Sequence, residues 1–329
     1  MTIVYVGSYG SGISVFERDG ARLTPLGRVD TPDPSFLVTD PAQRMLYAVD
    51  ELTDPSVAAF AIAGDGGLRE LNRYPTGGGS PCHLLYHPAG YLLAANYDSG
   101  SVSVHPIGPD GSLGPRADLV QHTGSGPDAH RQEGPHAHEV KLAGDLVVVV
   151  DLGIDKLIGY RLDPATGKLT TVADPFARTH PGAGPRHAVA HPNGRWYVAD
   201  ELDGTVSVFD PDPSTGILHE VAAVPSTMDG ASQPAGIALS AHMRRLYVSN
   251  RGPDTIATFA VDPAGDLALI DEVSSGGSWP RHFAIHEGVL FAANQNGNSV
   301  VSFTFDAEGL PRPTGDVVEV GSPTCVLPL

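Results

Sequence analysis

Hydrophobic and polar positions alternate in short runs along most of the chain, as in TVSVF (205–209), SVSVH (101–105) and SVVSF (299–303). Alternation with a period of two is typical of strands that bury one face. Few windows carry apolar residues at the i, i+3, i+4, i+7 spacing of an amphipathic helix. The chain also contains 39 Gly and 29 Pro, which separate the runs. The pattern predicts an all-β protein of short strands and tight turns.

A longer pattern recurs six times at intervals of several dozen residues. Each copy has a lead proline, two further residues, an apolar run, a turn, and a second apolar run that commonly ends on Asp or Asn. The copies are 33–60, 80–104, 134–160, 184–208, 233–259 and 279–303. A seventh copy is split, because SPTCVLPL at the C-terminus supplies its first strand and the first 29 residues supply the other three. The seven lead prolines are Pro34, Pro81, Pro135, Pro185, Pro234, Pro280 and Pro323.

A four-stranded unit of this length is typical of a propeller blade. The repeats therefore predict an all-β, seven-bladed β-propeller with four antiparallel strands per blade, as one domain over residues 1–329. We expect Thr324 to Val326 to pair with the strand around Ile3 to Gly7, so that the C-terminal strand closes the ring and leaves no exposed edge there. A β-rich sandwich with coincidental repeats is the alternative.

Charge and composition narrow the classes of partner. The formal net charge of −18 argues against nucleic acid, whose binders carry basic patches. There is no apolar run of 18 residues, and the start MTIVYVGSYG has no basic leader, so we expect no membrane partner and a cytoplasmic location. Two cysteines do not make a disulfide framework. An anionic small substrate would require a locally positive pocket in this acidic protein.

Polar residues gather at two recurring points of the repeat. In an antiparallel blade, the first strand starts and the second ends on the same side of the ring, near the central channel. We therefore expect one funnel lined by the residues after each lead proline and after each second strand. The first set is Ser35-Phe36, Cys82-His83, His136 to His138, Arg186-His187, Ala235-Gly236, Arg281-His282 and Thr324-Cys325. The second set is Tyr9, Asp50-Glu51, Asn96-Tyr97, Asp151, Asp200-Glu201, Asn250-Arg251 and Asn294-Gln295.

Arg186 and Glu201 should meet at this funnel, since they start and end paired strands of one blade. A salt bridge that only closes the mouth is one interpretation. Arginine and histidine recur on neighbouring blades, however, and like charges gathered at one place repel unless an anion joins them. Guanidinium groups suit bidentate binding of phosphate or carboxylate, so a binding site for an anion is the second interpretation.

The segment HTGSGPDAHRQEGP, residues 122 to 135, lengthens one link between blades. A long, polar, Gly-rich link over the funnel would form a lid or rim, and it carries His130, Arg131, Gln132 and Glu133. A mobile surface loop without a role is the alternative.

The sequence gives little support for a bound metal or cofactor. His136 and His138 are two residues apart on a strand and face the same way, and such pairs can bind zinc. The spacing offers no third or fourth ligand, so we expect no metal. The chain has no nucleophile elbow, Walker or dinucleotide motif in the required setting, and we expect no cofactor.

Four stretches carry a resemblance to a known family: residues 124–140, 182–210, 246–259 and 279–286, of which GAGPRHAVAHPNGRWYVADELDGTVSVFD (182–210) is the most specific. They resemble the bacterial lactonase family with a seven-bladed propeller, whose best-known members are 6-phosphogluconolactonases. The resemblance implies hydrolysis of 6-phospho-D-glucono-1,5-lactone to 6-phosphogluconate, in the pentose phosphate pathway and without metal. The family is also similar to fungal carboxy-muconate cyclising enzymes, in which a His, two Arg and a Glu are associated with the site. The resemblance implies that the histidine is His136 or His138, the arginines are Arg186 and Arg251, and the glutamate is Glu201.

A lactone hydrolase must supply a base for water and a positive group for the carbonyl oxyanion. We expect Glu201 to be the base, with His136, His138 or His187 as the second choice, and Arg186 to take part in catalysis. The expected substrate-binding residues are Arg251, Arg281, His282, His83, Asn96, Arg131 and Gln295. A lactonising isomerase and a non-catalytic binding propeller are the alternative functions. The ionic mouth argues against a propeller that binds an apolar peptide.

Overall fold

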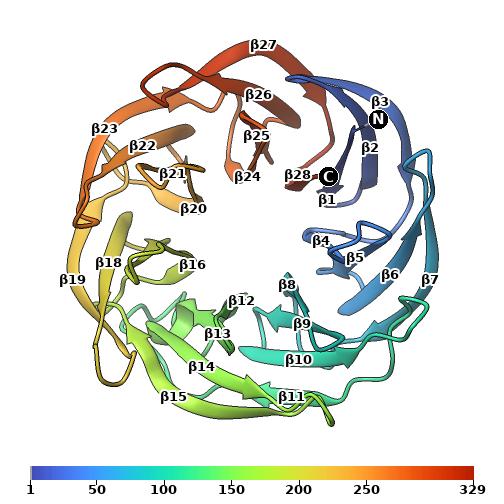
Figure 1. Ribbon diagram of the computed structural model, residues 1–329, viewed down its shortest axis with the longest axis horizontal. Coiled ribbons are helices and arrows are strands. Elements are labelled where there is room, and N and C mark those ends of the chain that lie inside the picture. Colours follow the sequence, from blue (N-terminus) through green and yellow to red (C-terminus); the bar gives the residue numbers. More distant parts are fainter. Residues whose placement is uncertain (1) are drawn as a thin grey trace.

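The computed structural model describes residues 2–329 and places seven four-stranded antiparallel sheets around a central axis (Figure 1). The split blade contains β28 (Pro323–Pro328), β1 (Thr2–Ser8), β2 (Gly12–Asp19) and β3 (Arg22–Val29). The second blade contains β4 (Leu37–Thr39), β5 (Met45–Asp50), β6 (Ser56–Ile62) and β7 (Leu68–Pro75). The third contains β8 (Pro81–His87), β9 (Tyr91–Asn96), β10 (Ser101–Pro106) and β11 (Asp118–Gln121). The fourth contains β12 (Ala137–Ala143), β13 (Leu146–Asp151), β14 (Lys156–Leu162) and β15 (Leu169–Arg178). The fifth contains β16 (Pro185–Ala190), β17 (Trp196–Asp200), β18 (Thr205–Pro211) and β19 (Leu218–Pro225). The sixth contains β20 (Gln233–Leu239), β21 (Arg245–Arg251), β22 (Thr255–Val261) and β23 (Leu267–Ser274). The seventh contains β24 (Pro280–His286), β25 (Val289–Asn294), β26 (Ser299–Phe305) and β27 (Pro311–Glu319). The predicted seven-bladed propeller is confirmed.

The ring is closed by strand pairing between the two ends of the chain. In the antiparallel pair of β28 and β1, Cys325 lies opposite Gly7 and Val326 lies opposite Val6. The Thr324 hydroxyl donates a hydrogen bond to the Gly7 carbonyl at 3.1 Å. The predicted closure is therefore confirmed: β28 covers the inner edge of β1 and is the innermost strand of this blade.

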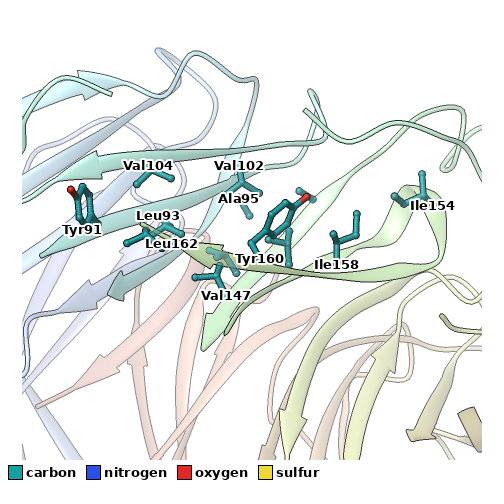
Figure 2. Close-up of a cluster of buried hydrophobic side chains, with 13 residues drawn as sticks. Tyr91, Leu93, Ala95, Val102, Val104, Val147, Ile154, Ile158, Tyr160 and Leu162 are labelled. Carbon is teal, nitrogen blue, oxygen red and sulfur yellow. The ribbon is translucent and has the colours of Figure 1, made fainter. Parts of the chain in front are cut away.

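Hydrophobic contacts between neighbouring blades hold the ring together. In one cluster, Tyr91 and Leu93 of one blade pack with Val147 and Tyr160 of the next (Figure 2). Strand alternation supplies these contacts, because each inner strand presents apolar side chains to both adjacent blades.

A recurring tyrosine adds a polar tie between blades. The hydroxyls of Tyr5, Tyr47, Tyr197 and Tyr247 donate to the carbonyls of Gly66, Gly111, Gly265 and Gly309, each in the outer turn of the next blade, at 2.9, 3.1, 2.8 and 2.7 Å. These buried hydroxyls are thus satisfied, as burial requires.

Among residues 2–329, helical structure is confined to one short turn. The 3-10 helix η1 spans Leu152–Ile154 and begins after Asp151, whose side chain accepts from the Gly153 amide. Within residues 2–329, no helix has the length and apolar character needed to cross a membrane.

Candidate active site

The predicted funnel is a pocket of about 440 Å³ at one end of the central channel. That volume is within the usual range for small-molecule sites. The lining residues are Tyr9, Glu51, Leu52, Ser80, Cys82, Tyr97, Asp98, Arg131, His138, Glu201, Gln233, Arg251, Trp279, Arg281 and Gln295. Most of these side chains are polar or charged.

Backbone bulges at the starts of the inner strands direct side chains toward this pocket. The pairing register shifts around Cys82, His138, Arg186 and Arg281, so each of these residues has no partner opposite it on the second strand. A bulge of this kind re-aims a side chain and is common beside active sites. Three of the four line the pocket, and the fourth, Arg186, contacts Glu201.

Glu201 is the centre of a cluster of guanidinium groups. Arg251 donates from Nη2 to Glu201 Oε2 at 2.6 Å, and Arg131 donates from Nη2 to Oε1 at 2.5 Å. Arg186 Nε lies 3.1 Å from Oε2, and its Nη1 donates to the Ala235 carbonyl at 2.8 Å. Arg186 and Glu201 therefore meet as predicted, in a four-residue cluster and not an isolated salt bridge.

The cluster carries more positive than negative charge. Burial raises the pKa of the Glu201 carboxyl, but the charges of Arg251, Arg186 and Arg131 outweigh it and hold this pKa well below its usual range. The pKa of Arg186 is lowered by its own burial and by the nearby Arg251. One carboxylate thus faces three cations, an arrangement that favours an additional anion.

Four imidazoles lie close together beneath the mouth, with His187 at their centre. The His187 ring is 5.3 Å from both the His138 and the His83 rings, measured between centroids. Burial is the main reason that the pKa values of His83, His138 and His187 lie well below the ordinary value, and it lowers that of His282 to about 4. All four are therefore neutral at pH 7, and of the four only His138 lines the pocket.

At the ends of most second strands, two adjacent residues face opposite sides of the strand, so one lines the pocket and the other does not. Tyr97, Glu201 and Gln295 line the pocket, whereas their predecessors point into the blades. Asn96 is fully buried and donates from Nδ2 to the Ser101 hydroxyl at 3.1 Å. The structure therefore does not bring Asn96 to the pocket, contrary to our expectation, because adjacent strand residues face opposite sides.

The link of residues 122–135 is fixed to the rim of the pocket. Gln132 is fully buried and donates from Nε2 to the Leu152 carbonyl at 2.9 Å and to Asp155 Oδ1 at 2.6 Å. The Asp128 carboxylate accepts from the Arg131 amide, and this turn directs Arg131 to Glu201. The link thus forms part of the rim and places the Arg131 guanidinium in the pocket.

His136 lies behind the pocket wall. Its ring stacks on Tyr97 with 4.6 Å between centroids, and its Nδ1 donates to the Tyr97 carbonyl at 3.0 Å. Of the two histidines considered together, only His138 reaches the pocket. In residues 2–329, no three His, Cys, Asp or Glu side chains are grouped so as to hold a metal ion.

Of the aromatic lining residues, Tyr9 and Tyr97 were in the expected set, whereas Trp279 was not. Trp279 packs against Arg251, whose Cζ is 5.5 Å from the ring centroid, and Tyr97 accepts from Arg131 at 3.1 Å. Trp279 stands directly before a lead proline, where Gly, Ser, Gln or Asp stands in the other copies. That departure from the repeat was a usable signal.

Comparisons with known proteins identify the family of the chain. Residues 3–328 match the family described as Lactonase, 7-bladed beta-propeller. The chain is 37% identical to a 6-phosphogluconolactonase of Bacillus subtilis, over 98% of this chain and 97% of the relative, and 32% identical to a 6-phosphogluconolactonase of Formosa agariphila, over 93% of each. The solved periplasmic gluconolactonase of Pseudomonas aeruginosa superposes with a TM-score of 0.88 at 31% identity, covering 100% of this chain and 99% of that one. The chain belongs to the seven-bladed β-propeller lactonase family.

Proposed function

We propose that this protein hydrolyses a phosphorylated sugar δ-lactone, most specifically 6-phospho-D-glucono-1,5-lactone to 6-phosphogluconate. The observation that carries the proposal is the pocket in which three arginines surround the single carboxylate of Glu201. This cluster, with three guanidinium groups to one carboxylate, has a surplus of positive charge for an anionic substrate and for the oxyanion that forms during ester hydrolysis. The names of the relatives point to the same substrate.

The reaction adds one water to the lactone carbonyl. A base takes a proton from the water, the new C–O bond forms at the carbonyl carbon, and the ring C–O bond then breaks. The ring oxygen receives a proton and leaves as a hydroxyl on the same molecule. In this proposal Arg251 stabilises the carbonyl oxyanion, because it is a pocket-lining guanidinium already fixed by its bond to Glu201.

We assign the base to His138 and not, as expected from the sequence, to Glu201. Both oxygens of Glu201 already accept hydrogen bonds from arginine, so neither is free to take a proton from water. His138 is a neutral imidazole in the pocket wall. After burial, the charge of Arg186 is the next cause that lowers its pKa, so a bound anion near the arginines would make His138 more basic.

The cellular location belongs to the same proposal. A phosphorylated sugar does not cross a membrane unaided, so an enzyme for this substrate would act where the substrate is made, in the cytoplasm. The protein would then need no nucleic acid or membrane partner, in keeping with its net charge of −18.

The test is a panel of lactones assayed by proton release, because each turnover at neutral pH produces a carboxylic acid that ionises. Purified protein should accelerate hydrolysis of 6-phosphogluconolactone far above the spontaneous rate in buffer. A carboxylated muconate substrate, followed by ultraviolet absorbance, tests the alternative of a cyclising isomerase. Activity on the muconate alone, or on neither substrate, would overturn the proposal.

A further inference from the structure

The third arginine that lines the pocket, Arg281, does not belong to the Glu201 cluster. Its nearest acidic partner is Glu51, with 3.7 Å between Nη2 and Oε1, which is beyond hydrogen-bond length. The Arg281 side chain makes no side-chain hydrogen bond in residues 2–329, and its Cζ lies 5.5 Å from the centre of the Tyr9 ring. It therefore keeps guanidinium donors available for a ligand.

The residues around Arg281 come from the side of the ring opposite Glu201. Arg281 is on β24, Tyr9 follows β1 and Glu51 follows β5, so three consecutive blades supply them. Glu201 follows β17, whose blade lies across the channel from β1 (Figure 1). All four residues line the same pocket. One ligand in this pocket would thus meet two separate positive groups.

Two further side chains near Arg281 have unused hydrogen-bonding capacity. Glu51 Oε2 and Gln295 Oε1 are buried acceptors with no hydrogen-bond partner among the described residues, so a ligand here must present donors such as sugar hydroxyls beside its phosphate. Buried polar atoms are ordinarily paired, and both side chains line the pocket. Burial, ahead of the neighbouring Glu51 carboxylate, raises the pKa of the Tyr9 hydroxyl, which stays protonated at neutral pH and can donate either to Glu51 or to a ligand.

We infer that Arg281, together with the Tyr9 hydroxyl and the Gln295 amide, is the subsite that binds the phosphate ester of the substrate. The inference rests on the proposed function and assigns the two ends of the ligand: the lactone carbonyl to the Glu201 cluster, and the phosphate to Arg281. A guanidinium with free donors matches phosphate geometry. Glu51 opposes this binding, because its carboxylate repels a phosphate beside the same guanidinium. Arg281 is then the residue that separates phosphorylated from unphosphorylated lactones.

The test measures kcat/KM of wild type, Arg281→Gln and Glu51→Gln for 6-phosphogluconolactone and for gluconolactone. Losing a hydrogen bond to a charged group changes a rate by about 10- to 150-fold. Arg281→Gln should lower the ratio of the two kcat/KM values by that factor, and Glu51→Gln should raise the ratio. Arg312→Gln, at an exposed position on β27, should leave the ratio as in wild type. Thermal melting of each variant identifies any that fail to fold, and Arg281→Lys, which keeps the charge, should retain part of the preference.

An Arg281→Gln variant that folds and loses both activities equally, or neither, would overturn the assignment. If wild type hydrolyses neither lactone, the proposed function fails, and the subsite is then judged by titration calorimetry with inorganic phosphate. Arg281→Gln should weaken phosphate binding at least tenfold, and Glu51→Gln should strengthen it. Equal affinities in all three proteins, or no binding to wild type, would overturn the subsite itself.

Discussion

Glu201 and Arg251 lie on neighbouring blades and are joined by a hydrogen bond of 2.6 Å between Oε2 and Nη2. Both side chains are almost completely buried, at 4% and 5% exposure. Removing one partner of a buried pair leaves an uncompensated charge, which typically costs about 3–5 kcal/mol. Losing either partner alone should therefore destabilise the ring as well as change the chemistry of the pocket.

Glu201→Gln should lower the melting temperature, because it leaves three arginines facing one another without a carboxylate. Added inorganic phosphate should raise the melting temperature of this variant more than that of wild type, since an anion replaces the lost charge. Glu319→Gln, at an exposed position, provides the control. Equal melting temperatures for wild type and Glu201→Gln, with no extra effect of phosphate, would contradict this prediction.

Arg131→Gln and Arg186→Gln should both lower activity, but they should differ in how much they lower the free energy of unfolding. The Arg131 side chain is 38% exposed, whereas that of Arg186 is 3% exposed. Urea unfolding should show a loss of about 1 kcal/mol or less for Arg131→Gln and about 3–5 kcal/mol for Arg186→Gln. Both should reduce kcat/KM for the phosphorylated lactone. Similar losses of stability in the two variants would show that burial does not distinguish them.

The buried imidazoles should make the protein sensitive to acid. Burial, and next Arg186, lower the pKa of His187 in the folded state, while the unfolded chain binds this proton near pH 6.5. The stability due to neutral His187 is therefore complete above pH 6.5 and is lost as the pH falls below it, by at most about 1.4 kcal/mol per pH unit.

His187→Gln removes this dependence. The difference in free energy of unfolding between wild type and His187→Gln, measured in urea, should shrink as the pH is lowered from 7 to 5. His219→Gln, at an exposed position on β19, is the matched control. A wild-type-to-variant difference that stays constant over this range would be incompatible with a buried neutral His187.

Lactonase activity should survive chelation. Arginines supply the positive charge that a metal would otherwise place on the carbonyl, and His136 and His138 have different partners instead of sharing a ligand site. Dialysis against EDTA should leave kcat as before. Stoichiometric zinc in the purified protein, with activity lost on its removal and restored on its return, would refute the prediction.

The sequence was sufficient to predict the ring, because the pattern that specifies a blade lies within one short segment and is repeated along the chain. Each blade carries its own lead proline and alternating strands, and the split copy required Thr324 to Val326 to pair with the strand around Ile3 to Gly7, as β28 and β1 do. The same repeat located the mouth, since strand starts and ends are fixed by the blade.

Which of two adjacent residues enters the mouth could not be predicted as readily. Alternation excludes Asn96 and admits Tyr97, and the bulges turn His138 and Arg281 toward the pocket. Three of the four bulged residues, Cys82, Arg186 and Arg281, directly follow a lead proline, but that the pairing register shifts there is visible only in the backbone. The three-way pairing of Glu201 was also hidden, since Arg131 and Arg251 are 70 and 50 residues away along the chain.

The most direct measurement is kcat/KM for 6-phosphogluconolactone in wild type and in a folded Arg251→Gln variant, corrected for spontaneous hydrolysis. We predict strong acceleration by wild type and a loss of about 10- to 150-fold in the variant, because Arg251 holds the developing oxyanion. Wild-type protein that hydrolyses the lactone no faster than buffer, or an Arg251→Gln variant with the wild-type rate, would contradict the account.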